Sequence, residues 1–145
     1  MADRERKNPS RSGVDEYGRA PIHLAAKEGN APLCSKLVAA GADPNAADDN
    51  GWTPLHFAAQ AQSIEATSLL LSVGAKTESR DKYGNTPLWR ATMTCRERGD
   101  VISLLRGAGA DPYSKNDSGV SPVDLARTIA NYPVAGFYAD LPAGG

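Results

Sequence analysis

One pattern recurs four times along this chain of 145 residues. The four copies read DEYGRAPIHLAA, DDNGWTPLHFAA, DKYGNTPLWRAT and NDSGVSPVDLAR, and they begin at Asp15, Asp48, Asp81 and Asn116. Their starts are 33, 33 and 35 residues apart. A second motif recurs at intervals of 33 and then 35 residues, as GADPN at Gly41, GAKTE at Gly74 and GADPY at Gly109. Two motifs in register indicate a repeated structural unit, whose apolar face is buried only against neighbouring units.

The middle of each copy carries residues that begin an α-helix. Thr53 belongs to the residue types that cap a helix N-terminus, and Pro54 fits the first helical position, where its missing N–H costs nothing. His56 then lies at the third helical position, from which its side chain can reach back to the cap. Ser121 and Asp124 provide the same arrangement with other residues. The pattern therefore predicts a helix start rather than a catalytic site.

Larger apolar residues between the two motifs predict a second helix in each unit. Its expected core residues are Leu33, Leu37, Val38, Leu69, Leu70, Leu71, Val101, Ile102, Leu104 and Leu105. Asn30 and Asn131, each two residues before a proline, are predicted to begin such helices, and the glycine of the second motif is predicted to end them. At the last repeat we expect Phe137 and Tyr138 to pack backward as a cap.

The period and the Thr-Pro-Leu-His box resemble the ankyrin repeat, over about residues 15–141. The resemblance implies an all-α ankyrin-repeat solenoid, in which each unit has a β-turn finger and two antiparallel helices. The chain departs from the usual box at Ala20 in place of Thr and at Trp89 in place of His. The expected organisation is a flexible N-terminal segment (1–14), one domain of four repeats (15–47, 48–80, 81–115, 116–141) and a C-terminal tail (142–145).

Charge and hydropathy exclude several classes of partner. The formal net charge is -1 and the pI is about 6.1, so no strong field attracts nucleic acid or an anionic membrane. No apolar stretch approaches the roughly 20 residues of a membrane span. The first residues lack the apolar core of a signal peptide. With only two cysteines, a disulfide framework is not expected, and we predict a cytoplasmic protein.

The two histidines do not form a metal site in this arrangement. His23 and His56 occupy equivalent positions in neighbouring repeats, so they are expected about 8–10 Å apart. Zinc ligands lie about 2 Å from the metal. The acidic stretch of residues 43–51 has Ala47 at a ligand position of the calcium-loop pattern, and its glycine comes too late. We therefore expect no metal and no cofactor.

The cysteines have different expected surroundings. Cys34 falls on a core position of a second helix. Cys95 lies in a loop with Arg96 and Arg98 nearby, and these charges are expected to lower its pKa. No histidine accompanies Cys95, so nothing assembles a nucleophile with a base. We predict that the protein is not an enzyme.

The resemblance implies that a partner protein binds the concave side, which is formed by the finger tips and the exposed faces of the first helices. Transferred to this chain, together with the irregular third repeat, it gives the candidate contacts Tyr17, Arg19, Asp49, Trp52, Lys82, Tyr83, Asn85, Trp89, Arg90, Met93, Arg96 and Arg98. Aromatic rings at finger tips have no core to fill and are typical interface anchors. The alternative is that each ring covers the adjacent finger.

The third repeat contains two additional residues, in the segment TMTCRERGD between Thr92 and Asp100. A departure confined to one repeat favours a partner-specific contact, because stacking does not require it. The alternative is a tolerated loop insertion.

A more specific hypothesis about function rests on resemblance. The segment RGDVISLLRGAGADPYSKNDSGVSPVDLARTIANY is similar to small stand-alone bacterial ankyrin proteins, some of which are immunity partners of secreted toxins. We therefore expect a protein that binds and neutralises a toxin, and that is a monomer when free. The alternatives are a cytosolic adaptor or inhibitor of a regulatory or host protein, and a structural subunit that assembles with itself.

Overall fold

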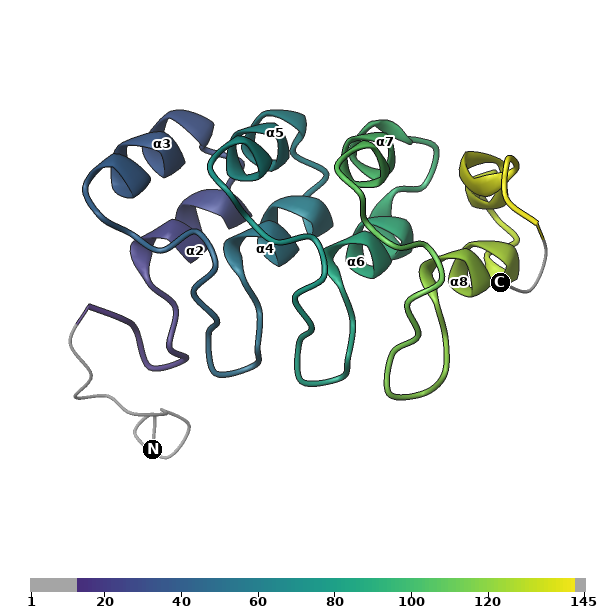
Figure 1. Ribbon diagram of the computed structural model, residues 1–145, viewed down its shortest axis with the longest axis horizontal. Helices are drawn as coiled ribbons and strands as arrows, with labels where there is room; N and C mark the ends of the chain where they lie inside the picture. Colours follow the sequence, from purple (N-terminus) through teal and green to yellow (C-terminus); the bar gives the residue numbers. More distant parts are fainter. Residues whose placement is uncertain (1–12, 143–145) are drawn as a thin grey trace.

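The computed structural model describes residues 13–142, which form one row of helical hairpins (Figure 1). The helices are α2 (Pro21–Lys27), α3 (Ala31–Ala39), α4 (Pro54–Gln60), α5 (Ile64–Ser72), α6 (Pro87–Thr94), α7 (Asp100–Gly107), α8 (Pro122–Thr128) and the 3₁₀ helix η1 (Val134–Tyr138). This part of the chain contains no strand, so the predicted all-α solenoid is confirmed. Residues 1–12 and 143–145, most of the predicted flexible segment and tail, lie outside the described residues.

The hairpins form two layers with a row of loops below them (Figure 1). Helices α2, α4, α6 and α8 make the inner row, and α3, α5, α7 and η1 make the outer row. The loops between successive hairpins extend from the inner row as parallel fingers, on the side away from the outer helices. Finger tips and inner helices therefore share one surface.

The predicted helix caps are confirmed in repeats two and four. The Thr53 hydroxyl accepts the N–H of His56 at 3.4 Å, and Nδ1 of His56 accepts the N–H of Thr53 at 3.1 Å. Ser121 and Asp124 exchange the equivalent bonds, both at 3.1 Å. The prediction for Asn131 is wrong, because η1 begins after Pro133 and has no side-chain cap.

The histidine of repeat two also joins neighbouring repeats. Because Nδ1 of His56 accepts a backbone N–H, the ring proton is on Nε2, which donates to the carbonyl of Asn85 in the next repeat at 2.8 Å. Nε2 of His23 instead lies 2.7 Å from the carbonyl of Ala46, in the loop that ends its own repeat. His56 therefore both caps its own helix and holds the finger of the following unit.

Small residues let the inner helices approach closely. Ala25, Ala26, Ala58, Ala59, Ala91 and Ala126 are almost completely buried. The outer helices contribute larger core residues, among them Leu70, Ile102 and Leu105. The prediction for Leu33 is wrong: it is 38% exposed, because α3 belongs to the first repeat and has a neighbour on one side only. Cys34, on the same helix, is buried as predicted.

The last repeat closes the core as predicted. Tyr138 of η1 is fully buried, and its hydroxyl is 2.6 Å from Oγ1 of Thr92 on α6. Phe137 packs against the hydrophobic core, and its carbonyl accepts a bond from Arg106 at 2.9 Å. Arg106 also pairs with Asp140 at 2.7 Å. The short 3₁₀ helix thus replaces the outer helix of an ordinary unit.

The buried ring of Tyr138 leads to a first prediction. Tyr138→Ala should lower the free energy of unfolding by about 4 kcal/mol, because it leaves a cavity under the terminal cap. Tyr138→Phe, the matched control, should cost only about 1 kcal/mol. Thr92 still donates to the carbonyl of Leu88 in that variant and is not left without a partner. Urea unfolding followed by circular dichroism measures both; equal losses would contradict the packing role of the ring.

The second prediction concerns pH. Burial lowers the pKa of His56 below its ordinary value of 6.5. The unfolded chain therefore takes up a proton more readily than the native protein, and stability is lost as the pH falls below 6.5. The loss should reach at most about 1.4 kcal/mol per pH unit. His56→Gln, which retains a capping side chain, should flatten the pH profile of the unfolding free energy between neutral pH and the range where carboxylates titrate; an unchanged slope would contradict the assignment.

Candidate partner-binding surface

In each finger, a side-chain carboxylate or amide oxygen accepts two backbone hydrogen bonds and so orders the loop. Oδ1 of Asp48 accepts the N–H groups of Asn50 and Trp52, both at 2.9 Å. The same pair of bonds recurs at Asp15, Asp81 and Asn116. These bonds occupy backbone groups that a finger would otherwise expose to water, so each tip is held in one conformation.

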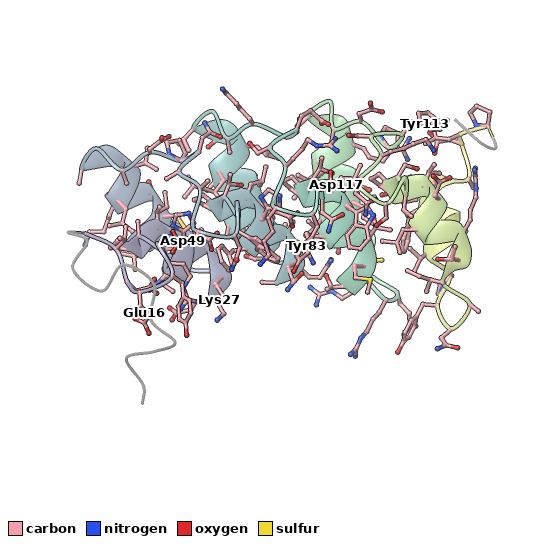
Figure 2. The ribbon with its side chains drawn as sticks, turned by 90° about the horizontal axis from the view of Figure 1, so that it is seen from below. Glu16, Lys27, Asp49, Tyr83, Tyr113 and Asp117 are labelled. Carbon is pink, nitrogen blue, oxygen red and sulfur yellow. The ribbon has the colours of Figure 1, made fainter. Side chains whose placement is uncertain are left out.

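Neighbouring fingers lie against each other at their tips. The N–H of Lys82 donates to the carbonyl of Asn50 at 2.9 Å, and a similar bond joins each successive pair. Gly51 has a φ of 77°, and a Cβ there would lie 2.9 Å from Cα of Asp81. Figure 2 shows Glu16, Asp49, Tyr83 and Asp117 in order along the row of fingers. The tips therefore form one preformed edge.

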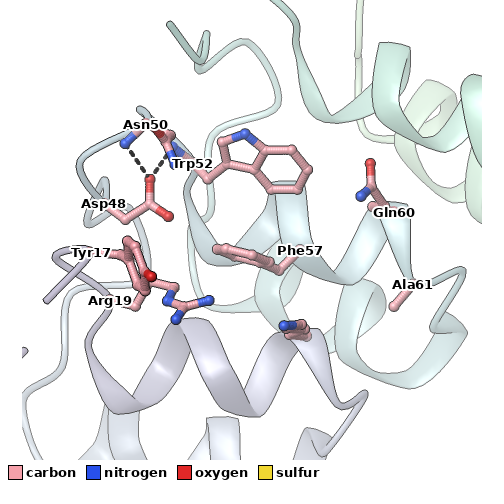
Figure 3. A pocket seen from close by; sticks show the side chains of 9 residues that line it. Tyr17, Arg19, Asp48, Asn50, Trp52, Phe57, Gln60 and Ala61 are labelled. Carbon is pink, nitrogen blue, oxygen red and sulfur yellow. Dashed lines mark hydrogen bonds between the residues drawn. The ribbon is translucent and has the colours of Figure 1, made fainter. Parts of the chain in front are cut away.

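A groove of about 630 Å³ lies where the first two fingers meet the inner helices (Figure 3). Its lining residues are Tyr17, Arg19, Lys27, Asp48, Asn50, Trp52, Phe57, Gln60 and Ala61. Of the residues that the sequence predicts as partner contacts, Tyr17, Arg19 and Trp52 are brought together here. The candidate set omitted Asp48 and Phe57. Phe57 directly follows the box histidine, which is the position that Arg90 holds in repeat three, and that register is the signal that could have identified it.

Trp52 is half-buried and has structural contacts as well as a face in the groove. Its ring centroid lies 4.9 Å from that of Phe57 and 5.6 Å from that of His56. The guanidinium of Arg90 from the next repeat lies 4.5 Å from the Trp52 centroid. The ring therefore packs against α4 and against Arg90 of α6, and it also lines the groove.

Arg90 is held by an ion pair inside the protein. Its guanidinium donates to Oδ2 of Asp81 at 2.6 and 3.1 Å, and the Asp81 side chain is fully buried. The same group lies 5.5 Å from the ring centroid of Trp89, whose Nε1 is buried without a partner among the described residues. Arg90 and Trp89 thus make contacts inside the protein, and Arg90 connects repeat three to Trp52 of repeat two.

Asn85 faces inward. It is 5% exposed, and its Oδ1 accepts a bond from Asn116 at 2.8 Å. Its carbonyl accepts the bond from His56. Asn85 joins fingers together and offers little surface to a partner.

Tyr83 and Met93 are the most exposed large apolar candidates. Tyr83 is 56% exposed at a finger tip, with the ammonium of Lys82 5.2 Å from its ring centroid, and Met93 is 54% exposed at the end of α6. Met93 and Arg96 line a smaller hollow of about 230 Å³, together with Tyr132. Arg98 and Asp49 are exposed, but neither lines this hollow or the first groove.

The loop of repeat three differs from the prediction at its cysteine. Cys95 is buried, and burial raises the pKa of its thiol, so the expected lowering by Arg96 and Arg98 is wrong. Arg96 and Arg98 are both exposed to solvent. The loop also supports the cap, because Gly99 lies where a Cβ would be 2.7 Å from Cδ1 of Phe137.

The described residues contain no cluster of three histidine, cysteine or acidic side chains that could hold a metal ion. Among the helices of residues 13–142, none has the length and apolar character needed to cross a bilayer.

Stacked hairpins with a shared finger edge define a solenoid repeat protein, a class that commonly uses concave surfaces for binding. A family model described as ankyrin repeats (3 copies) matches residues 8–116, and this chain belongs to the ankyrin repeat family. A comparison with curated proteins found no match. Ankyrin repeats are protein-binding modules, and this chain is one of them.

The ion pair of Arg90 gives the third prediction. Arg90→Ala leaves the buried carboxylate of Asp81 without its cation, and should lower the free energy of unfolding by about 3 kcal/mol. Arg98→Ala, which removes an exposed arginine from the same repeat, should change it by less than about 0.5 kcal/mol. Chemical denaturation measures both. Similar small losses would mean that Asp81 does not depend on Arg90.

Proposed function

We propose that this protein is an immunity protein, which binds a cognate bacterial toxin on its concave surface and neutralises it by covering it. Its sequence resemblance to small bacterial ankyrin proteins, over the last two repeats, supports the toxin as partner. The observation that carries the proposal is the continuous edge of finger tips and inner helices. On that edge Tyr83 and Met93 are more than half exposed, and Met93 lines the smaller of the two hollows.

The bonding of the fingers favours tight binding. Each tip is already held by its Asp or Asn oxygen and by a bond to the next finger. A surface that is ordered before binding loses little conformational entropy when the partner arrives. A stoichiometric inhibitor needs such affinity, because it blocks its target only while it is bound.

The proposed contact surface follows the candidates that the structure leaves accessible. It consists of Tyr17, Arg19, Asp49, Trp52, Phe57, Lys82, Tyr83, Met93, Arg96 and Arg98. Trp89 and Arg90 contribute only the parts of their side chains that their internal contacts leave uncovered. Asn85 is left out because it is buried. The exposed arginines are expected to steer the partner more than to hold it.

The proposal includes a cytoplasmic monomer without enzymatic activity. Cys34 and Cys95 are both free and buried, which suits a reducing compartment. Size-exclusion chromatography with light scattering tests the monomer directly.

The fourth prediction tests the toxin. Expressing this chain together with the toxin encoded beside its gene should restore growth, and the two proteins should form an isolable complex with a Kd on the order of 1 nM. Rescue without a complex would contradict neutralisation by covering. No rescue and no complex would overturn the immunity role.

Variants of the same complex locate the surface. Tyr83→Ala should weaken toxin binding by about 2 kcal/mol or more, because an exposed aromatic ring is a typical anchor residue. Leu33→Ala is the matched control, since it removes an exposed apolar side chain from the outer helix α3 instead. Calorimetric titration compares them. Loss of affinity in Leu33→Ala alone would place the contact on the outer helices.

A further inference from the structure

The groove between the first two fingers contains a carboxylate oxygen without a partner. Oδ1 of Asp48 accepts two backbone bonds, but no group among residues 13–142 bonds to its Oδ2. The residue is only 9% exposed, and it lines the groove. In Figure 3 its second oxygen points toward the space bounded by Arg19 and Phe57. Among residues 13–142 no cation lies within 4.0 Å of this oxygen, and it is open to the groove rather than sealed in the core, so it is a candidate for pairing with a bound group.

The other two finger carboxylates have an arginine of their own. Oδ2 of Asp15 accepts a bond from Nε of Arg19 at 2.9 Å. Oδ2 of Asp81 accepts two bonds from Arg90, at 2.6 and 3.1 Å. In repeat two the corresponding positions hold Trp52, where repeat one has Arg19, and Phe57, where repeat three has Arg90. The aspartate of repeat two is therefore kept while both possible internal cations are replaced by aromatic rings.

The rings around Asp48 suit a guanidinium. Tyr17, Trp52 and Phe57 line the groove together with the carboxylate. The next junction shows the same combination occupied from within, since the guanidinium of Arg90 binds Asp81 while it lies 4.5 Å from the centroid of Trp52. A planar guanidinium both stacks on aromatic faces and pairs with a carboxylate, which an ammonium does less well. The groove of about 630 Å³ has room for such a side chain.

The charge around the groove also favours a cation. The finger segments 15–19 and 48–52 contain four acidic residues and one arginine. That arginine, Arg19, is already paired with Asp15. Lys27, the last residue of α2, is exposed and is the other cation that lines the groove. A partner carboxylate entering between the fingers would meet a predominantly acidic edge.

We propose that this groove binds an arginine side chain of the partner protein, with Oδ2 of Asp48 accepting from the guanidinium and the surrounding rings packing against it. The inference rests on the proposed function, because it names the chemistry with which the concave surface recognises its protein partner.

The test titrates the isotope-labelled full chain with N-acetyl-arginine amide and follows the indole of Trp52 and the amide of Asn50 by NMR. Saturable shifts are expected at both. Asp48→Asn should weaken the binding about tenfold, because it removes the charge that strengthens the bond. The variant should fold, since an asparagine oxygen accepts the same two backbone bonds at Asn116. Its thermal midpoint checks this.

Glu65→Gln is the matched control, because it removes an equal charge from an exposed position on the outer helix α5 and should leave the affinity within about twofold. N-acetyl-citrulline amide, which is neutral, should not bind. Equal binding of citrulline or of N-acetyl-lysine amide would overturn the inference. So would an equal loss in Glu65→Gln, or saturation by N-acetyl-glutamate amide.

Titration with the toxin separates the two proposals. If the toxin binds the native chain and Asp48→Asn equally well, the arginine pocket is wrong and the proposed function stands. If the native chain does not bind the toxin, the proposed function fails, while the probe titration still decides whether the groove accepts a guanidinium.

Discussion

Close packing of alanines between the inner helices determines the geometry of this protein. A residue such as Ala58 or Ala91 on each inner helix removes the side-chain volume that would otherwise separate neighbouring units. Because the helices are this close, the ring of His56 reaches the carbonyl of Asn85 in the next repeat. Wider spacing would break this bond and separate the finger tips. The concave surface thus depends on a packing distance that is set within the core.

The fingers use one bonding scheme with different electrostatic results. In each finger, Oδ1 of the aspartate or asparagine orders the tip, and in an aspartate Oδ2 remains to pair with a cation. Asp15 pairs with Arg19 and Asp81 with Arg90, whereas Asn116 carries no charge. Only Asp48, among these four, retains a charged oxygen that faces a groove without a partner. The residue position that stabilises repeats one and three is therefore the one that we propose for recognition in repeat two.

The irregular third repeat has two roles that reinforce each other. Trp89 and Arg90 stand where repeat two has His56 and Phe57, and the guanidinium of Arg90 lies over the rings of both Trp89 and Trp52. These larger side chains strengthen the junction between repeats two and three. The longer loop passes close to Phe137 at Gly99, while Met93 and Arg96 remain accessible beside it. An insertion can thus support the terminal cap and still alter the surface that a partner meets.

The sequence by itself determined the fold, because the repeat spacing, the caps at Thr53 and Ser121 and the glycines after each outer helix are local signals. It also predicted candidate contact positions on the fingers and inner helices, since helix register is a local property. Only the tertiary structure decided what those positions do. Asn85 is turned inward, Cys95 is buried and Arg90 is bound to Asp81 because of contacts between repeats, which spacing within one repeat does not encode. For the same reason, the motif of repeat two does not show by itself that Oδ2 of Asp48 lacks a partner, because the cation that pairs with such an oxygen comes from different positions in different repeats.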